Sequence, residues 1–231
     1  LTGLSADAMK SSRARMQMVF QDPFASLNPR LPVSDLVTEP AFLHGMVKQS
    51  DRHSMAIDLL DRVGLEPEAA NRYPHQFSGG QRQRICIARA LSVRPRVIVA
   101  DEAVSALDVS IARKVTDLMA DIQLRDGVSF LFISHDMAVV ERVSHHVGVM
   151  YLGRIVELGP RARVFENPQH AYTQALMKAV PIADPRRRKS EKDLNFKPIP
   201  SPIHGLEYRP EPSVYNEVEP GHYVLTTESG Y

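Results

Sequence analysis

One stretch, residues 77–108, constrains the fold of this 231-residue chain more than any other. It opens with the small-residue turn Ser78–Gln81 (SGGQ), whose glycines let a backbone approach an anion closely. The apolar run Val97–Ala100 follows and predicts a strand that is buried on both faces. Two carboxylates, Asp101 and Glu102, come directly after it, at the edge where α/β sheets bind their ligands. The stretch therefore predicts an α/β sheet with a site at its carboxyl edge.

The segment after Glu102 repeats this pattern of a strand followed by polar residues. Apolar residues recur at helical spacing between positions 111 and 122, which predicts an amphipathic helix ended by Asp126-Gly127. Val128–Ile133 predicts a second buried strand, and His135 follows it. A lone histidine is most often a structural group, but this one follows a predicted strand just as Asp101 and Glu102 follow theirs. The strand–helix–strand alternation predicts a parallel sheet.

A third strand with a polar residue after it lies upstream. Residues 16–20 (MQMVF) predict a short strand, and Gln21 follows it. Taken alone, Gln21 is most simply a polar residue that ends a strand. From Gln21 to Ser78 the chain reads as short helices and loops. Positions 56, 59, 60 and 63 form one apolar helix face, and Gly64 is placed to end that helix.

Taken together, these segments resemble the ABC-type ATPase cassette. The resemblance implies an α/β fold of the P-loop NTPase type, with a parallel sheet core and a helical subdomain at about residues 31–93. It implies ATP and Mg²⁺ as cofactors, and it makes Ser78–Gln81 the signature turn, which acts on ATP that a second subunit holds. The implied site residues are the catalytic Glu102, His135 and Gln21, the metal-binding Asp101 and Gln21, and the ATP-contacting or interface residues Ser78, Gly79, Gly80, Gln81 and Asp108.

Two further runs resemble the oligopeptide/dipeptide importer branch of this family. FQDPFASLNPR surrounds Gln21, and VFENPQHAYTQALMKAVPIADP resembles the carboxyl-terminal extension of these importers. Relatives usually carry prolines where Ala103 and Ala171 stand here. The predicted domains are an ATPase core at residues 1–159, the extension at 160–185, and a proline-rich, weakly ordered tail at 186–231.

One part of such a cassette is not found in the sequence. No GxxxxGK[ST] phosphate-binding motif occurs in the 231 residues. In the family this motif precedes the segment around Leu1, so the sequence resembles a cassette that is incomplete at its amino end. We expect residues 1–231 alone not to bind or hydrolyse ATP measurably, because the phosphates would face the carboxylates of Asp101 and Glu102. We also expect an exposed strand edge.

Composition and charge narrow the remaining options. A net charge of +1 gives no argument for a nucleic-acid partner, and the basic run at residues 186–189 is interpreted as a solvated linker. The single cysteine, Cys86, excludes an internal disulfide and is expected in the core. Arg82, Arg84 and Arg89 are interpreted as a solvated, salt-bridged helix face rather than a phosphate-binding cluster. No apolar run approaches the roughly 18 residues of a membrane span.

The resemblance implies the ATP-binding and hydrolysing subunit of an importer for oligopeptides or dipeptides, bound peripherally at the cytoplasmic face of the inner membrane. Its implied partners are a second ABC ATPase subunit (in a homo- or heterodimer), two membrane permease subunits and an external substrate-binding protein, with no nucleic acid. Two alternatives stay open. One is a truncated, non-hydrolysing cassette that only supplies a signature motif in trans, and the other is an ABC ATPase of a non-transport process.

Overall fold

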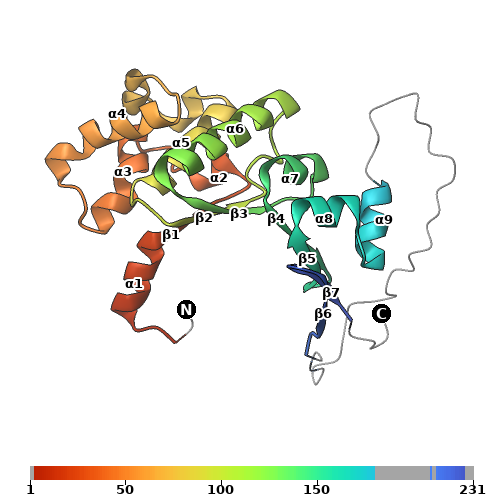
Figure 1. The fold of residues 1–231 in the computed structure, drawn as a ribbon. Helices are drawn as coiled ribbons and strands as arrows, with labels where there is room; N and C mark the ends of the chain where they lie inside the picture. Colours follow the sequence, from red (N-terminus) through yellow and green to blue (C-terminus); the bar gives the residue numbers. More distant parts are fainter. Residues whose placement is uncertain (1–2, 180–208, 210–211, 227–231) are drawn as a thin grey trace. The chain divides into compact units, whose positions relative to one another are not determined.

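The computed structural model describes residues 3–179, 209 and 212–226 (Figure 1). The chain divides into two units, residues 1–136 and 137–231, and each unit has its own sheet. In the part of the chain that the structure describes, no helix is long and apolar enough to cross a membrane. The basic run at residues 186–189 lies outside the described residues.

The first unit is a parallel sheet with helices packed against it. Its elements are α1 (Ala6–Arg15), β1 (Met16–Val19), α2 (Pro23–Ser26), α3 (Val33–Leu43), η1 (Gln49–Asp51), α4 (Arg52–Arg62), η2 (Pro67–Asn71), η3 (Pro74–Gln76), α5 (Gly79–Leu91), β2 (Val97–Asp101), α6 (Val109–Asp126) and β3 (Ser129–Ile133). The strands lie in the order β1-β2-β3, and both pairings are parallel. The predicted parallel α/β arrangement is confirmed.

The register of this sheet brings the predicted site residues to one edge. Val19 pairs with Ala100, and Asp101 pairs with Ile133. Because all three strands run in the same direction, the residues that follow them leave the sheet at its carboxyl edge. Gln21, Glu102 and His135 therefore belong to neighbouring loops, although long helical segments separate them in the sequence.

Burial of the strands differs from the prediction. Ile98 and Ala100 of β2 are fully buried, but Val97 and Val99 on the opposite face are only half-buried, so β2 is not buried on both faces. The predicted burial of the next strand was also wrong, because Leu131 of β3 is 57% exposed. The reason is that helices α2–α6 lie on one side of the sheet (Figure 1) and that β3 pairs only with β2 among the described residues.

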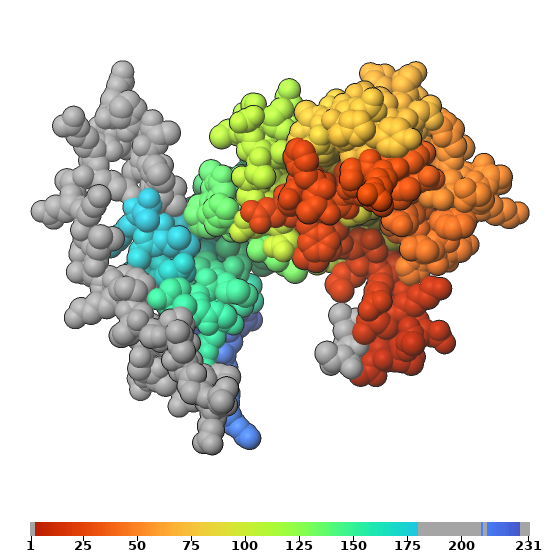
Figure 2. Space-filling view, turned by 180° about the vertical axis from the view of Figure 1, so that it is seen from behind, coloured from red at the N-terminus to blue at the C-terminus, as the bar shows by residue number. Residues whose placement is uncertain are grey.

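The helices of the first unit begin and end where local sequence signals place them. Ser78 caps α5, and left-handed glycines follow α4 and α6 at Gly64 and Gly127, as predicted. Helices α3, α4 and α5 pack on one another, and the orange and yellow segments form one continuous surface in Figure 2. Cys86 is 2% exposed within α5, which confirms its core position, and burial raises the pKa of its thiol to about 11.

The second unit is a small antiparallel sheet with short helices. Its elements are α7 (Met137–Val143), β4 (His146–Tyr151), β5 (Arg154–Pro160), α8 (Arg161–Glu166), α9 (Ala171–Ala179), β6 (Tyr215–Glu219) and β7 (His222–Leu225). The strand order is β4-β5-β7-β6. β4 and β5 form an antiparallel hairpin, with Gly153 in the left-handed conformation at its turn. Its core consists of valines 147, 149, 156 and 164, and the Tyr151 ring stacks on Tyr172 at 4.2 Å.

The tail differs from its prediction in one segment. A weakly ordered stretch was expected from residue 186 onward, but residues 215–225 form the hairpin β6–β7, which adds two strands to the sheet. Gly221 adopts a left-handed conformation in the turn between them, with φ of 74°. The preceding prolines obscured this short hairpin in the sequence pattern.

Candidate functional site

Glu102 and His135 meet at the carboxyl edge of the parallel sheet. Glu102 directly follows the last residue of β2, and His135 follows β3 by two positions. The Nδ1 atom of His135 lies 3.2 Å from the Oε1 atom of Glu102. Their side chains are 71% and 31% exposed, so an incoming molecule can reach both. Glu102 and His135 are 33 positions apart in the sequence, and the fold brings them together as the sequence predicts.

The backbone of Glu102 is strained. Its φ of 47° lies in the left-handed region, which is uncommon for a residue with a side chain. The Glu102 N–H donates to the Ile133 carbonyl at 2.9 Å, and the Glu102 carbonyl accepts from the Ser105 N–H at 3.0 Å and from its hydroxyl at 2.9 Å. Such strain costs about 1–3 kcal/mol and persists only where surrounding bonds hold it. It marks Glu102 as more than a solvated surface carboxylate.

Asp101 and Gln21 reach the same edge from β2 and from the loop after β1. Oxygen donors of this kind suit Mg²⁺, which usually binds through one or two carboxylates, substrate phosphates and water. The two side chains are a donor set that fits this ion. Within the described ranges, no three His, Cys, Asp or Glu side chains gather into a metal-binding group.

The signature turn Ser78–Gln81 forms the first turn of α5. The Ser78 hydroxyl accepts from the Gln81 N–H at 3.4 Å, and the Gln81 side chain accepts from the Ser78 N–H at 3.0 Å. This reciprocal capping box fixes the start of the helix. The N–H groups of Gly79 and Gly80 lie in the first turn, where helix N–H groups have no intrahelical partner. Such a helix start favours an anion.

The two glycines of this turn pack against the segment that contains Asp108. A Cβ atom added at Gly79 would lie 3.6 Å from Leu107, an ordinary contact. A Cβ atom added at Gly80 would lie closer than 3.0 Å to the Cγ2 atom of Ile111 in α6. Asp108 is exposed and precedes α6 as its N-cap residue. The signature turn therefore packs against Leu107 and Ile111, which lie on either side of the predicted interface residue Asp108.

The arginines of α5 correct the sequence interpretation, because they anchor the helix rather than form a solvated face. Arg82 is 7% exposed, and its Nε donates to the Pro74 carbonyl at 2.7 Å. Its guanidinium also lies 3.6 Å from the centre of the Phe24 ring. Arg84 donates to the Val63 carbonyl at 3.0 Å, and Arg89 donates to the Ser26 carbonyl at 2.6 Å.

These anchors tie α5 to the segment after Gln21, a link that the sequence analysis missed. Phe24 and Ser26 both lie in α2, so Arg82 and Arg89 hold that helix from two points. Gln83, which is fully buried, adds a bond of 3.5 Å to the Phe20 carbonyl. The spacing of the arginines gave no signal, because their acceptors are carbonyl groups of distant residues.

A parallel sheet with an Asp-Glu pair and a histidine at its carboxyl edge is the arrangement of a P-loop-type ATP-binding cassette. The chain belongs to the ABC transporter family. The family model "ABC transporter" matches residues 2–105, and the model "Oligopeptide/dipeptide transporter, C-terminal region" matches residues 156–205. The second match agrees with the predicted resemblance to the oligopeptide/dipeptide importers.

Two similar curated proteins from different bacteria share one name. The glutathione import ATP-binding protein GsiA of Pectobacterium atrosepticum is 54% identical over 221 residues, which is 96% of this chain. Its counterpart from Escherichia coli K12 is 53% identical over 228 residues, or 99% of this chain. The chain spans 36–37% of the length of these relatives.

A solved structure supports the fold. A dimeric ATP-binding cassette in a post-hydrolysis state, bound to ADP and Pi, matches with a TM-score of 0.59 and 30% sequence identity. The match covers 69% of this chain and 68% of that chain.

Proposed function

We propose that this chain forms part of the ATP-hydrolysing subunit of an ABC importer. The observation that carries the proposal is the Glu102–His135 contact of 3.2 Å, at the edge where two parallel strands end. A carboxylate in that place can orient or deprotonate an attacking water, and an adjacent imidazole can fix its orientation. The family membership and the identity to import ATP-binding proteins support the same conclusion.

In this proposal each site residue has a separate role in ATP hydrolysis. Glu102 acts as the base toward water, and His135 keeps Glu102 in place and contacts the terminal phosphate. Asp101 and Gln21 would hold Mg²⁺, which supplies neutralising charge to the phosphates when bound. The N–H groups of the signature turn would face the phosphates of ATP held by a second subunit, and Asp108 would lie at that interface.

A cassette of this kind also needs a phosphate-binding P-loop. We infer that a segment outside residues 1–231 supplies it and adds a strand beside β3. Two features support this inference: β3 pairs on one side only among the described residues, and its Leu131 and Ile133 are exposed. An unpaired strand edge and an uncovered apolar face are unfavourable in water until another element covers them.

The proposed partners follow from the family. They are a second ATPase subunit, two membrane permease subunits and an external binding protein, with the ATPase bound peripherally at the cytoplasmic face of the membrane. For the transported solute, the predicted class was oligopeptides or dipeptides. The similar proteins are named for glutathione import, and glutathione is itself a tripeptide. We therefore expect the transported solute to be glutathione or a peptide of similar length.

Uptake by a strain that lacks the gene tests this proposal. The strain is complemented with the complete gene, either unchanged or with Glu102→Gln, and is supplied with labelled glutathione, a dipeptide or an oligopeptide. We expect the unchanged gene to restore uptake of glutathione and the Glu102→Gln variant to restore none. Restored uptake of the dipeptide or the oligopeptide, without uptake of glutathione, would contradict glutathione as the transported solute. ATP turnover by the purified protein without uptake of any of the three would favour a different process.

A further inference from the structure

The hairpin β6–β7 joins the second unit through contacts with β5. Val224 and Tyr223 pair with Glu157 and Leu158 of β5. The Tyr215 hydroxyl donates to the Ile155 carbonyl at 2.8 Å. The hairpin lies beyond residue 205, where the match to the importer C-terminal region ends. It nevertheless pairs with β5, most of which lies within that match.

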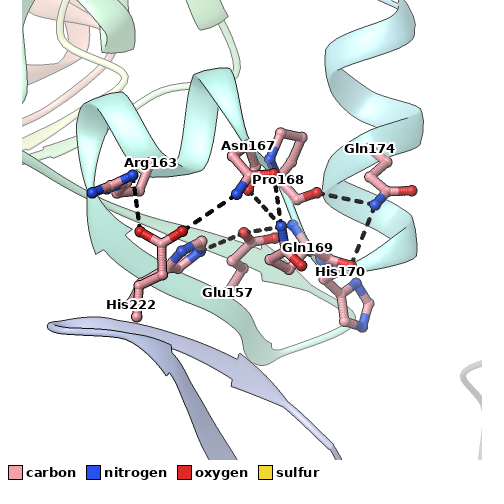
Figure 3. A network of polar contacts seen from close by, with 9 residues as sticks. Glu157, Arg163, Asn167, Pro168, Gln169, His170, Gln174 and His222 are labelled. Carbon is pink, nitrogen blue, oxygen red and sulfur yellow. Dashed lines mark hydrogen bonds and ion pairs between the residues drawn. The ribbon is translucent and has the colours of Figure 1, made fainter.

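At the centre of this contact is a fully buried pair, Glu157 and His222, both 0% exposed (Figure 3). The His222 Nε2 lies 2.7 Å from the Glu157 Oε1, although the two residues are 65 positions apart. The Glu157 carboxylate also accepts from the backbone N–H groups of Gln169 and His170, at 2.9 Å each. A buried carboxylate is tolerated only when donors surround it, and the hairpin supplies one of the three donors that the described residues provide.

The direction of the hydrogen bond follows from its surroundings. The other ring nitrogen of His222, Nδ1, is buried without a hydrogen-bond partner among the described residues. A buried N–H without an acceptor costs more than a lone pair without a donor, and the Glu157 carboxylate can only accept. The geometry therefore fits Nε2 as the donor to Glu157.

Close packing, as well as hydrogen bonding, holds β7 against β5. A Cβ atom at Gly159 would lie 3.0 Å from the His222 Cδ2 and 3.3 Å from the His222 Cα. The close approach of β7 to β5 thus depends on a glycine at this position. At the rim, Arg163 contacts Glu219 of the hairpin at 2.9 Å, and Asn167 donates to the same carboxylate at 3.5 Å. The hairpin therefore contacts the start of the turn between α8 and α9 directly, and it contacts the end of that turn through Glu157.

We propose that residues 212–226 form a latch and that His222 is a positioning residue, which holds the Asn167–His170 turn in place through the Glu157 carboxylate. When His222 occupies its site, Glu157 is fixed by its third donor and presents its oxygens to the Gln169 and His170 N–H groups. When the hairpin leaves, that carboxylate becomes open to water, and the turn loses its fixed acceptor. The turn lies within the importer C-terminal region, so any effect on transport rests on the proposed function.

Hydrogen exchange of the protein expressed from its complete gene tests the latch without relying on transport. His222→Leu removes the donor and keeps the apolar bulk, whereas His222→Gln restores an amide N–H near the position of Nε2. We expect His222→Leu to speed exchange of the Gln169 and His170 amides about tenfold or more, and His222→Gln to restore most of the protection. His146→Leu, the same change at an exposed position of β4, is the matched control and should leave exchange unchanged.

Gly159→Ala is a second route to the same state, because it displaces β7 without changing a polar group. It should speed exchange of the same two amides, while peptides from β4, which pairs with β5 and not with β7, stay within about twofold of wild type. Unchanged protection of Gln169 and His170 in both variants would overturn the proposal. Loss of protection throughout the second unit in both variants would also overturn it, because the hairpin would then belong to the folding core and not act as a latch.

Discussion

The second glycine of the signature turn should be required by packing as well as by the approach of a ligand. A Cβ atom at Gly80 would lie closer than 3.0 Å to the Ile111 Cγ2, whereas one at Gly79 would keep 3.6 Å from Leu107. Because isoleucine branches at Cβ, its Cγ2 cannot swing away without a shift of α6. We expect Gly80→Ala to destabilise the first unit by about 1–3 kcal/mol, the usual cost of overpacking. Gly79→Ala should be neutral or stabilising, since alanine favours a helix over glycine by up to about 1 kcal/mol.

Urea unfolding of the purified protein, followed by circular dichroism, measures this difference from the midpoint and slope of the transition. A double-mutant cycle then isolates the contact, because Ile111→Ala removes the methyl group that the new Cβ would strike. The cost of Gly80→Ala should largely disappear in the Ile111→Ala background. Equal stabilities of the two glycine variants, or no coupling in the cycle, would refute the packing argument.

Three other outcomes follow from buried groups. Arg82→Ala should lower the free energy of unfolding in urea by about 2–4 kcal/mol, because it removes a charged hydrogen bond to the Pro74 carbonyl and the contact with the Phe24 ring. Arg113→Ala, at an exposed position, should leave the free energy of unfolding almost unchanged. Burial lowers the pKa of His170 below its ordinary 6.5, so the folded state favours the neutral ring, whose Nδ1 accepts an N–H of α9. Stability of the second unit should therefore be full above about pH 6.5 and fall as the pH drops toward the lower pKa of the folded state, and His170→Gln should remove this dependence. Cys86, with its pKa raised to about 11 by burial, should resist iodoacetamide at pH 8 until the protein unfolds, and rapid labelling of the folded protein would contradict its placement.

Local signals in the sequence predicted much of the first unit. Strands were read from short apolar runs, and helix ends from Ser78, Gly64 and Gly127, because caps and left-handed glycines act within one turn of the chain. The edge that gathers Glu102 and His135 could also be predicted, since parallel strands deliver their carboxyl ends to one side of a sheet.

The remaining features depend on contacts between distant residues, which leave no local pattern. Arg82 and Arg89 have the spacing of a solvated helix face, yet their acceptors are carbonyl groups in other elements. The hairpin β6–β7 is short and follows a proline-rich stretch, and it is held by a histidine whose partner lies 65 positions away. Burial of β3 was predicted from its apolar residues, but burial also depends on what covers the strand.

The catalytic role of Glu102 is tested by measuring ATP binding and ATP turnover in the Glu102→Gln variant of the protein expressed from its complete gene. We expect turnover to fall by about 10²–10⁴ or more, since a general base is lost, while Mg²⁺-dependent ATP binding is retained. Asp101→Asn is the matched contrast and should instead weaken binding of Mg²⁺ and ATP. Near-normal hydrolysis by the Glu102→Gln variant would contradict the assignment of Glu102 as the catalytic carboxylate.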